Sequence, residues 1–170
     1  KPYREALTKL QKDAPPLPAA KVHRVLDGQL GTKWRERFQS FDDKPVASAS
    51  IGQVHRAVWS DGRDVAVKIQ YPDAHRIVRA DMLQLRTFIP LIHRLLPTLD
   101  VKALLDEHAD RLWEELDYTR EAHWQEMFRT AWSQAHPGVV TIPRVLFAEP
   151  TLLVTEWLPG IPYSSLVDAP

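Results

Sequence analysis

Two alternating segments separated by a short turn constrain this chain more than any other feature. Residues 54–59 and 65–70 each alternate between side chains suited to the two faces of a strand, and Asp61-Gly62 lies between them. The pattern predicts a β-hairpin. Because successive strand side chains point to opposite faces, Ala66 and Lys68 share one face, about 7 Å apart along the strand.

A run of small residues leads into this hairpin: Ala47-Ser48-Ala49-Ser50-Ile51-Gly52-Gln53-Val54. Small residues are needed where backbone must approach a polyphosphate closely, and a lysine on the following strand supplies the positive charge that phosphates require. The run therefore predicts a phosphate-covering loop, with Lys68 on the phosphates and Ala66 against the nucleotide base. A lone strand lysine is more commonly a solvated residue. The prediction that Lys68 binds phosphates therefore depends on the loop that precedes it.

Residues 45–57, followed by Asp61-Gly62 and Val65-Ala66-Val67-Lys68-Ile69-Gln70, resemble the UbiB family of atypical protein-kinase-like proteins, also called AarF or ADCK. In that family an alanine-rich loop replaces the glycine-rich loop of ordinary protein kinases. The resemblance implies an α+β fold, the N-terminal lobe of a kinase. We expect about five antiparallel strands, a long helix of the αC type, extra helices after the lysine strand and an N-terminal helical extension.

A helical pattern that runs from Val101 to Phe128 predicts the longest helix of the chain. A kinase-like lobe needs a helix carboxylate to pair with the strand lysine, and Glu121 is the first choice as the catalytic partner of Lys68. Glu115 and Asp117 remain alternatives. A solvated helix face is the competing interpretation of all three acids.

The resemblance supports this choice, because Glu115-Leu116-Asp117 matches the Glu-x-Asp motif of the UbiB family and Glu121 follows at the expected distance. In that family the two acids of the motif interact with a lysine motif further upstream and help hold accessory helices over the nucleotide pocket. Glu115 and Asp117 are therefore expected to form a regulatory acidic motif.

The resemblance also assigns a hinge, Glu156-Trp157-Leu158-Pro159-Gly160, whose backbone is expected to bind the adenine. The expected cofactor is ATP with Mg. We expect no metal ligand in this chain, because the catalytic aspartate and the metal-binding asparagine and aspartate follow the hinge in kinase-like proteins. The expected nucleotide-binding residues are Ala47, Ser48, Ala49, Ser50, Ile51, Gly52, Gln53, Val54, Ala66, Lys68, Glu156, Trp157 and Leu158.

The expected domain organisation has three parts. Residues 1–42 form a partial helical extension, 43–160 the kinase-like lobe with a helical insert at 76–135, and 161–170 the start of a connection to a second lobe. Because the chain begins and ends abruptly, we interpret it as a fragment of a larger protein.

Several shorter elements are predicted within these parts. They are helices at 3–11 and 19–30, the second ending at Gly31, an amphipathic stretch at 76–96 that Pro90 should kink or break, and strands at 143–147 and 152–157.

Composition excludes some classes of function. Lysine and arginine number 22, as do aspartate and glutamate, so no net charge draws the chain to nucleic acid, and we expect none as a partner. There is no cysteine, which rules out disulfides and thiolate metal sites. No signal peptide or membrane-spanning run is evident. We expect a cytoplasmic protein, peripheral to a membrane in its full-length form.

Two functional hypotheses remain open. The first is the nucleotide-binding lobe of a UbiB-type atypical kinase or ATPase that supports isoprenoid quinone (ubiquinone-type) biosynthesis, inactive as a fragment. The second is a pseudokinase-like scaffold that binds nucleotide, lipid or protein without catalysis. An ordinary protein kinase or a small-molecule phosphotransferase fits the alanine-rich loop less well. Expected partners are a nucleotide and, in the full-length protein, a membrane surface or lipid; a homodimer is a further alternative.

Overall fold

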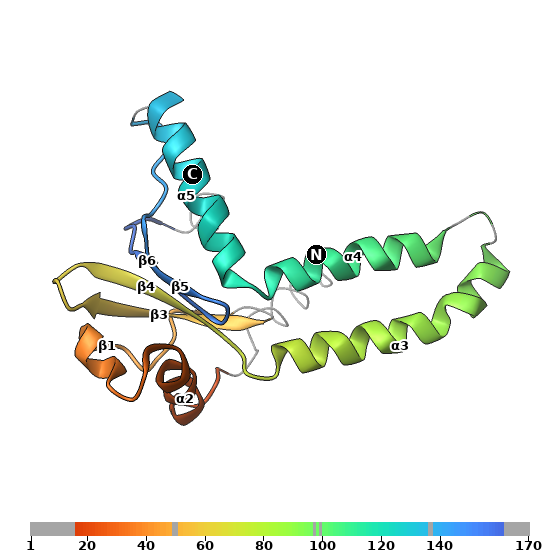
Figure 1. Cartoon of the computed structure of the whole chain (residues 1–170), viewed down its shortest axis with the longest axis horizontal. Helices are drawn as coiled ribbons and strands as arrows, with labels where there is room; N and C mark the ends of the chain where they lie inside the picture. Colours follow the sequence, from red (N-terminus) through yellow and green to blue (C-terminus); the bar gives the residue numbers. More distant parts are fainter. Residues whose placement is uncertain (1–15, 49–50, 97, 99, 136–137, 162–170) are drawn as a thin grey trace, which may run out of the picture.

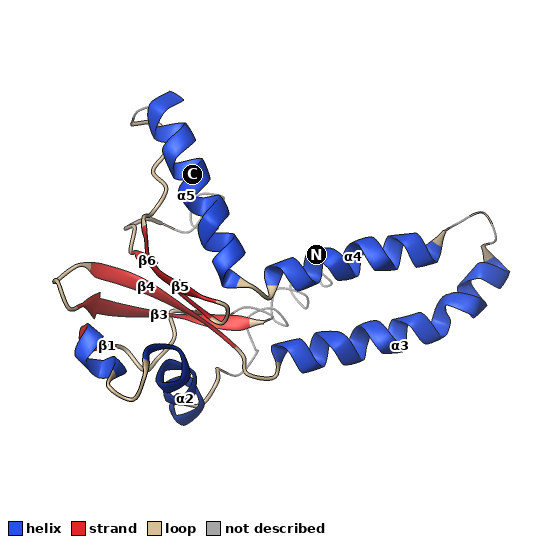
Figure 2. Ribbon diagram, in the orientation of Figure 1, coloured by secondary structure: helices blue, strands red, loops and turns tan. Residues whose placement is uncertain are grey.

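The fold is built on one antiparallel sheet. The computed structural model describes residues 16–48, 51–96, 98, 100–135 and 138–161. Six strands form the sheet, in the order β1-β3-β4-β6-β5 with β2 paired to β3 (Figures 1 and 2). Their bounds are β1 Phe38–Phe41, β2 Ala47–Ser48, β3 Gly52–Trp59, β4 Asp64–Gln70, β5 Val145–Glu149 and β6 Leu152–Glu156.

The predicted β-hairpin is present as β3 and β4, joined by a turn in which Gly62 has a φ of 90°. Only glycine adopts this left-handed conformation without strain. In the register of the central strands, Lys68 on β4 lies opposite Val54 on one side and opposite Leu153 of β6 on the other. The lysine is therefore held at the middle of the sheet.

Helices lie on both sides of the sheet and beyond its end. They are α2 Ala19–Leu30, the 3₁₀ turn η1 Trp34–Arg37, α3 Ala74–Leu95, α4 Val101–Glu115 and α5 Tyr118–Ala135. In Figure 1, α5 crosses the β5 and β6 side of the sheet, whereas α3 and α4 project together as a helical hairpin. The expected helix at 3–11 lies outside the described residues.

The main hydrophobic core lies between α2 and one face of the sheet. Val22 and Leu26 of α2 pack there against Val65, Val67 and Ile69 of β4, and all five side chains are fully buried. Trp34, Phe38 and Phe41 close the core at its β1 edge. The α2 bounds match the prediction, and the helix stops at Gly31, whose φ is 84°. Helix α2, which was expected to belong to an N-terminal extension, thus contributes to the core of the lobe.

The prediction of one long helix from 101 to 128 is wrong. The chain leaves the helix at Leu116 and Asp117 and restarts as α5 at a different angle. The Asp117 carboxylate accepts hydrogen bonds from the Thr119 backbone N–H at 3.0 Å and from its hydroxyl at 2.6 Å, which caps the new helix. The apolar period continues through the break, so periodicity did not reveal it.

Two other regions refine the sequence expectations. Of the two alternatives for the stretch around Pro90, a kink or a break, the structure has the first: α3 is one helix that bends toward its far end in Figure 1 and does not break. Strands β1 and β2 had not been assigned, and β5 covers Val145–Glu149, two residues later at each end than the predicted 143–147.

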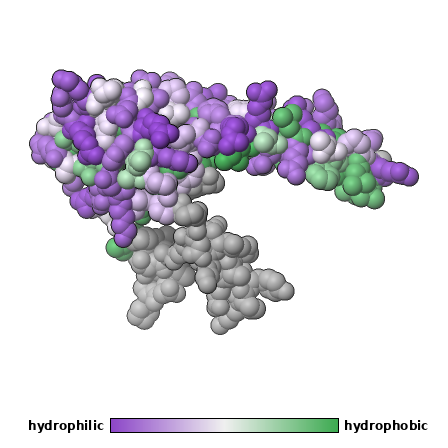
Figure 3. All heavy atoms as spheres, turned by 90° about the horizontal axis from the view of Figure 1, so that it is seen from below, coloured by the Kyte–Doolittle hydropathy of each residue, from purple (hydrophilic) through white to green (hydrophobic). Residues whose placement is uncertain are grey.

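The helical hairpin carries much exposed apolar surface. An ion pair between Arg86 and Asp106, 2.8 Å apart, joins α3 to α4. Figure 3 shows apolar side chains gathered toward the tip of the hairpin. The exposed apolar side chains along and just after α3 include Leu83, Leu85, Phe88, Leu91, Leu95 and Leu96. Among the helices in the described part of the chain, none combines the length and apolar character needed to span a bilayer.

Candidate nucleotide site

The centre of the candidate site is an ion pair between Lys68 of β4 and Glu121 of α5. The Lys68 Nζ lies 2.9 Å from Glu121 Oε1 and 2.6 Å from Oε2, so both carboxylate oxygens accept from the ammonium. Lys68 is 31% exposed and Glu121 43% exposed. The contact expected from the sequence is therefore present, and the ammonium keeps an open side toward solvent.

Three contacts fix α5 so that Glu121 reaches Lys68. At its start, the Tyr118 N–H donates to the Pro150 carbonyl at 3.1 Å. About two turns further on, Gln125 Nε2 donates to the Pro143 carbonyl at 2.7 Å, and Glu126 Oε1 accepts from the Val145 N–H at 2.8 Å. The helix is thus bound along its length to the segment that forms the edge of the sheet.

Glu126 also binds Arg129, with 2.8 Å between its Oε2 and the arginine Nε. The hydrogen bond from Arg129, followed by that from the Val145 N–H, lowers the pKa of the Glu126 carboxyl. The Glu126 carboxylate, which anchors α5, is therefore stabilised in its charged form by these contacts.

Within the described residues, Lys68 forms its ion pair with Glu121 and not with either acid of the expected regulatory motif. Asp117 is occupied as the cap of α5. Glu115 is exposed at the end of α4 and lines a hollow of about 320 Å³ together with Glu121 and Trp124. Arg120 closes part of this hollow by pairing with Glu114 at 2.7 Å. The regulatory role of Glu115 and Asp117 stays a prediction.

Most of the alanine-rich loop follows the edge of the sheet beside Lys68. Ala47 and Ser48 are exposed and form β2 opposite Val54 and Gln53, whereas Ala49 and Ser50 lie outside the described residues. Ile51 packs beneath the loop against Leu116 and Tyr118. Val54, half-buried, shares a sheet face with Lys68 and with Ala66.

Gln53 does not share this orientation, because its side chain is fully buried on the α2 side of the sheet. Its Oε1 accepts from the Leu17 N–H at 2.7 Å, and its Nε2 lies 2.8 Å from His55 Nε2. Since an amide nitrogen can only donate, His55 Nε2 must accept, and His55 Nδ1 then donates to the Asp42 carbonyl at 2.8 Å. Gln53 thus ties the segment before α2 to the sheet.

The expected hinge begins at Glu156, the last residue of β6. The Trp157 N–H donates to the Asp64 carbonyl at 3.0 Å, and the Trp157 ring lies 5.3 Å from the Arg56 guanidinium. Leu158 is exposed, which leaves it accessible to a ligand.

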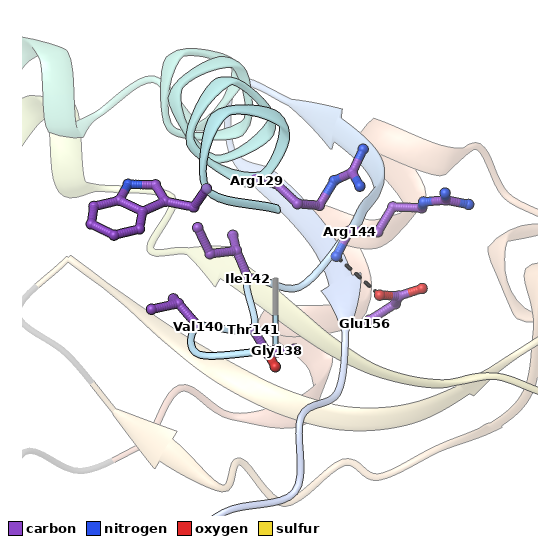
Figure 4. Close-up of a pocket in the computed structure, with 8 residues that line it drawn as sticks. Arg129, Gly138, Val140, Thr141, Ile142, Arg144 and Glu156 are labelled. Atoms are coloured by element: carbon purple, nitrogen blue, oxygen red, sulfur yellow. Dashed lines mark hydrogen bonds between the residues drawn. The ribbon is translucent and has the colours of Figure 1, made fainter. Parts of the chain in front are cut away.

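The side chain of Glu156 belongs to a separate pocket of about 400 Å³ at the C-terminal end of α5 (Figure 4). There its Oε2 accepts from the Arg144 N–H at 3.1 Å, and Arg129 and Arg144 lie on one side of the pocket. The Lys68–Glu121 pair does not line this pocket. A side-chain contact of Glu156 with a nucleotide at Lys68 is thus not supported by this placement.

Among the described residues, no group of three or more histidine, aspartate and glutamate side chains is arranged to hold a metal ion. The residues that do surround Lys68 fit the phosphates of a nucleotide: an ammonium fixed by a carboxylate, next to a loop of small residues.

Comparison with known proteins decides the family. The ABC1 atypical kinase-like domain matches residues 9–169. The chain belongs to this family of atypical kinases. The mitochondrial atypical kinase coq-8 of Caenorhabditis elegans is 34% identical over 167 residues, which cover 95% of this chain and 22% of that protein. AarF domain-containing protein kinase 1 of Xenopus tropicalis is 32% identical over 160 residues, covering 93% and 30%.

A solved structure supports the fold of this ABC1-family chain. The structure of Rv3197 from Mycobacterium tuberculosis in complex with erythromycin matches with a TM-score of 0.75 and 52% identity, over 98% of this chain and 41% of that one. The resemblance to the UbiB, AarF and ADCK proteins and the predicted α+β kinase-like lobe are therefore confirmed. The chain spans between about a fifth and two fifths of these relatives.

Sequence reasoning missed one residue of the site. Tyr118 is fully buried beside the ion pair, with the Lys68 Nζ 4.5 Å from the centre of its ring. The position directly after the Glu-x-Asp motif, at the first residue of α5, is the signal that could have indicated it.

Proposed function

We propose that the sheet face carrying Lys68 binds the triphosphate of ATP, as the N-terminal lobe of a UbiB-type atypical kinase or ATPase. The observation that carries this proposal is the two-oxygen contact of Glu121 with the Lys68 ammonium. In kinases such a pair places the lysine on the phosphates. The partly exposed ammonium has one further hydrogen to donate, because an ammonium is a triple donor and two of its hydrogens go to Glu121.

The neighbouring residues support the same assignment. Ala66 lies two residues before Lys68 on the same sheet face and is small enough to leave room for a base. Val54 offers an apolar surface opposite Lys68. Apolar contact for the base and a fixed charge for the phosphates are the two requirements of a nucleotide pocket.

The proposal extends to the whole protein. Mg would accompany ATP, and its ligands and the catalytic base would come from a second lobe, since phosphoryl transfer needs residues beyond the lysine and its carboxylate. These 170 residues alone are then expected to be inactive. By family resemblance, the full-length enzyme would support isoprenoid quinone biosynthesis. A cytoplasmic enzyme peripheral to a membrane, with the exposed apolar surface of α3 facing lipid, is part of this proposal; a homodimer remains an alternative.

A binding experiment tests the nucleotide site. Mg-ATP is titrated by calorimetry into the full-length protein, into Lys68→Met and into the control Lys102→Met, which removes the same charge from exposed α4. Loss of a charge-assisted contact should weaken binding by about 10- to 150-fold in Lys68→Met and leave the control unchanged. Equal affinities in all three proteins would refute the site.

A second measurement separates the enzyme from the pseudokinase-like scaffold. Phosphate release from Mg-ATP is followed with this chain and with a chain extended through the second lobe. The proposal predicts turnover only in the extended chain. Binding without turnover in both would favour the scaffold, and comparable turnover in the short chain would contradict the assignment of the catalytic residues to another lobe.

A macrolide is a second candidate ligand. The 52% identity to Rv3197, whose structure is a complex with erythromycin, favours this candidate. Erythromycin titrated into the full-length protein should give saturable binding if the property is shared. Absence of heat and of any change in tryptophan fluorescence at millimolar erythromycin would exclude it.

A further inference from the structure

Tyr118 occupies an unusual position beneath the ion pair. Its ring is completely buried and packs against Leu153 and Ile51, while the Lys68 Nζ lies over it, 4.5 Å from the ring centre. A cation at this distance over an aromatic face is attracted by the negative charge of the π-system. Lys68 is therefore contacted from two directions, by the carboxylate of Glu121 and by this ring.

The phenol hydroxyl of Tyr118 has no hydrogen-bond partner among the described residues, although it is buried. Burial, together with the nearby charge of Glu121, raises the pKa of this phenol, so the hydroxyl stays neutral. A buried and unpartnered hydroxyl costs free energy. The contribution of Tyr118 to the site therefore comes from its aromatic face and not from its hydroxyl.

The hydroxyl end of the same side chain faces Gly52 at the base of the alanine-rich loop. A Cβ atom added at Gly52 would lie 2.8 Å from the Tyr118 hydroxyl oxygen and 2.5 Å from the Ile69 carbonyl oxygen. These distances are too short for any side chain. The loop can approach β4 so closely only because residue 52 is glycine, and Tyr118 lies directly against that approach.

We propose that Tyr118 is a positioning residue for the nucleotide site, whose ring face holds the Lys68 ammonium beside Glu121. A lysine side chain has four rotatable bonds, and a single ion pair that is partly exposed restrains it weakly. The ring adds a second restraint from below. This inference rests on the proposed nucleotide function, which it deepens.

The first test needs no nucleotide. In a proton–carbon NMR spectrum of the full-length protein, the ε-methylene signal of Lys68, assigned with Lys68→Met, should be shifted upfield by the ring current. Tyr118→Phe keeps the ring and should keep the shift, while Tyr118→Met should lose it. A signal at the position of exposed lysines in the wild-type protein would overturn the inference, even if the Met variant does not fold.

The second test is a double-mutant cycle on ATP affinity. Tyr118→Met should weaken Mg-ATP binding by about 3- to 30-fold, and Tyr118→Phe should leave it unchanged. In a Lys68→Met background, Tyr118→Met should have little further effect, because the ring acts through the lysine. Equal losses in both backgrounds would show that Tyr118 is only a packing residue and would overturn the proposal.

The cycle also separates the two claims. If Lys68→Met leaves ATP affinity unchanged, the proposed function fails. If Lys68→Met weakens binding while Tyr118→Met in a folded protein does not, the nucleotide site stands and the positioning role of Tyr118 is wrong.

Discussion

The two faces of strand β4 show how one short segment serves both stability and chemistry. Val65, Val67 and Ile69 point toward α2 and are fully buried, whereas Ala66 and Lys68 between them point to the other face and are only half-buried. The first set belongs to the main hydrophobic core. The second set forms the candidate site. The alternation lets binding residues change with little effect on the core, and this separation can be tested.

The largest expected effect is a difference in stability between two valine-to-alanine substitutions, one on the buried face and one on the Lys68 face. Val67→Ala deletes two buried methyl groups and should lower the free energy of unfolding by about 2–3 kcal/mol. Val54→Ala, the same change on the Lys68 face of the neighbouring strand, should cost less than about 1 kcal/mol, since Val54 is half-buried. Urea unfolding measures the free energy of unfolding of both variants, and ATP titration measures their affinity for the nucleotide. Equal stability losses would contradict the division between the faces.

A second prediction concerns the close approach of the loop to β4. Gly52→Ala should destabilise the protein by about 1–3 kcal/mol, because the added methyl group would overlap the Ile69 carbonyl. Gly28→Ala is the control, because the space around Gly28 in α2 is open, and it should stabilise the helix by about 0.5–1 kcal/mol. Thermal unfolding of the two variants should therefore shift in opposite directions, and shifts of the same sign would refute the packing argument.

A smaller effect is expected where α5 is anchored. Glu126→Gln removes the charge that binds Arg129 and the Val145 N–H, and should cost about 1 kcal/mol and weaken ATP binding by loosening α5. Glu107→Gln on α4 breaks an exposed pair with Arg111 and should cost at most about 0.5 kcal/mol. Unchanged ATP affinity in Glu126→Gln would show that the anchor does not support the site.

The smallest effect concerns pH and belongs to the α2 face. Burial lowers the pKa of His55 from the ordinary value of 6.5, against the opposing influence of the Asp42 carbonyl and of Asp43. The neutral ring thus stabilises the fold fully above pH 6.5, and this contribution is lost as the pH falls from there through the lowered pKa. His55→Gln should flatten this part of the stability profile. An identical profile in the variant would contradict the assignment.

The sequence predicted the elements whose patterns are local. The β3–β4 hairpin alternates strictly around its turn, and α2 has helical spacing and ends at Gly31, so both could be predicted. The two halves of the 101–128 helix could not be separated, because Leu112 and Leu116 continue the apolar period up to the break and the Asp117 cap was overlooked. At this point the polar cap of Asp117 decides where the new helix begins, although the hydrophobic pattern continues.

The site was predictable to the same degree. Lys68 and Glu121 were found because the loop, the strand and the helix each carry a recognisable pattern, although they are distant in sequence. The orientation of Gln53 could have been inferred, because it alternates with Val54 and shares a face with His55. The place of Tyr118 directly after the Glu-x-Asp motif could have drawn attention to it, but its contact with Lys68 could not have been inferred, since this contact depends on the angle at which α5 restarts.

The central claim is that Lys68 faces the phosphates of bound ATP. An ATP acyl-phosphate reagent transfers its acyl group to a lysine amine next to the phosphates and releases ATP, and mass spectrometry identifies the labelled residue. The account predicts preferential labelling of Lys68 in the full-length protein, suppressed by excess ATP, with Lys44 and Lys102 labelled weakly and without competition. Labelling of Lys68 at the level of these exposed lysines, or labelling that ATP does not suppress, would contradict it.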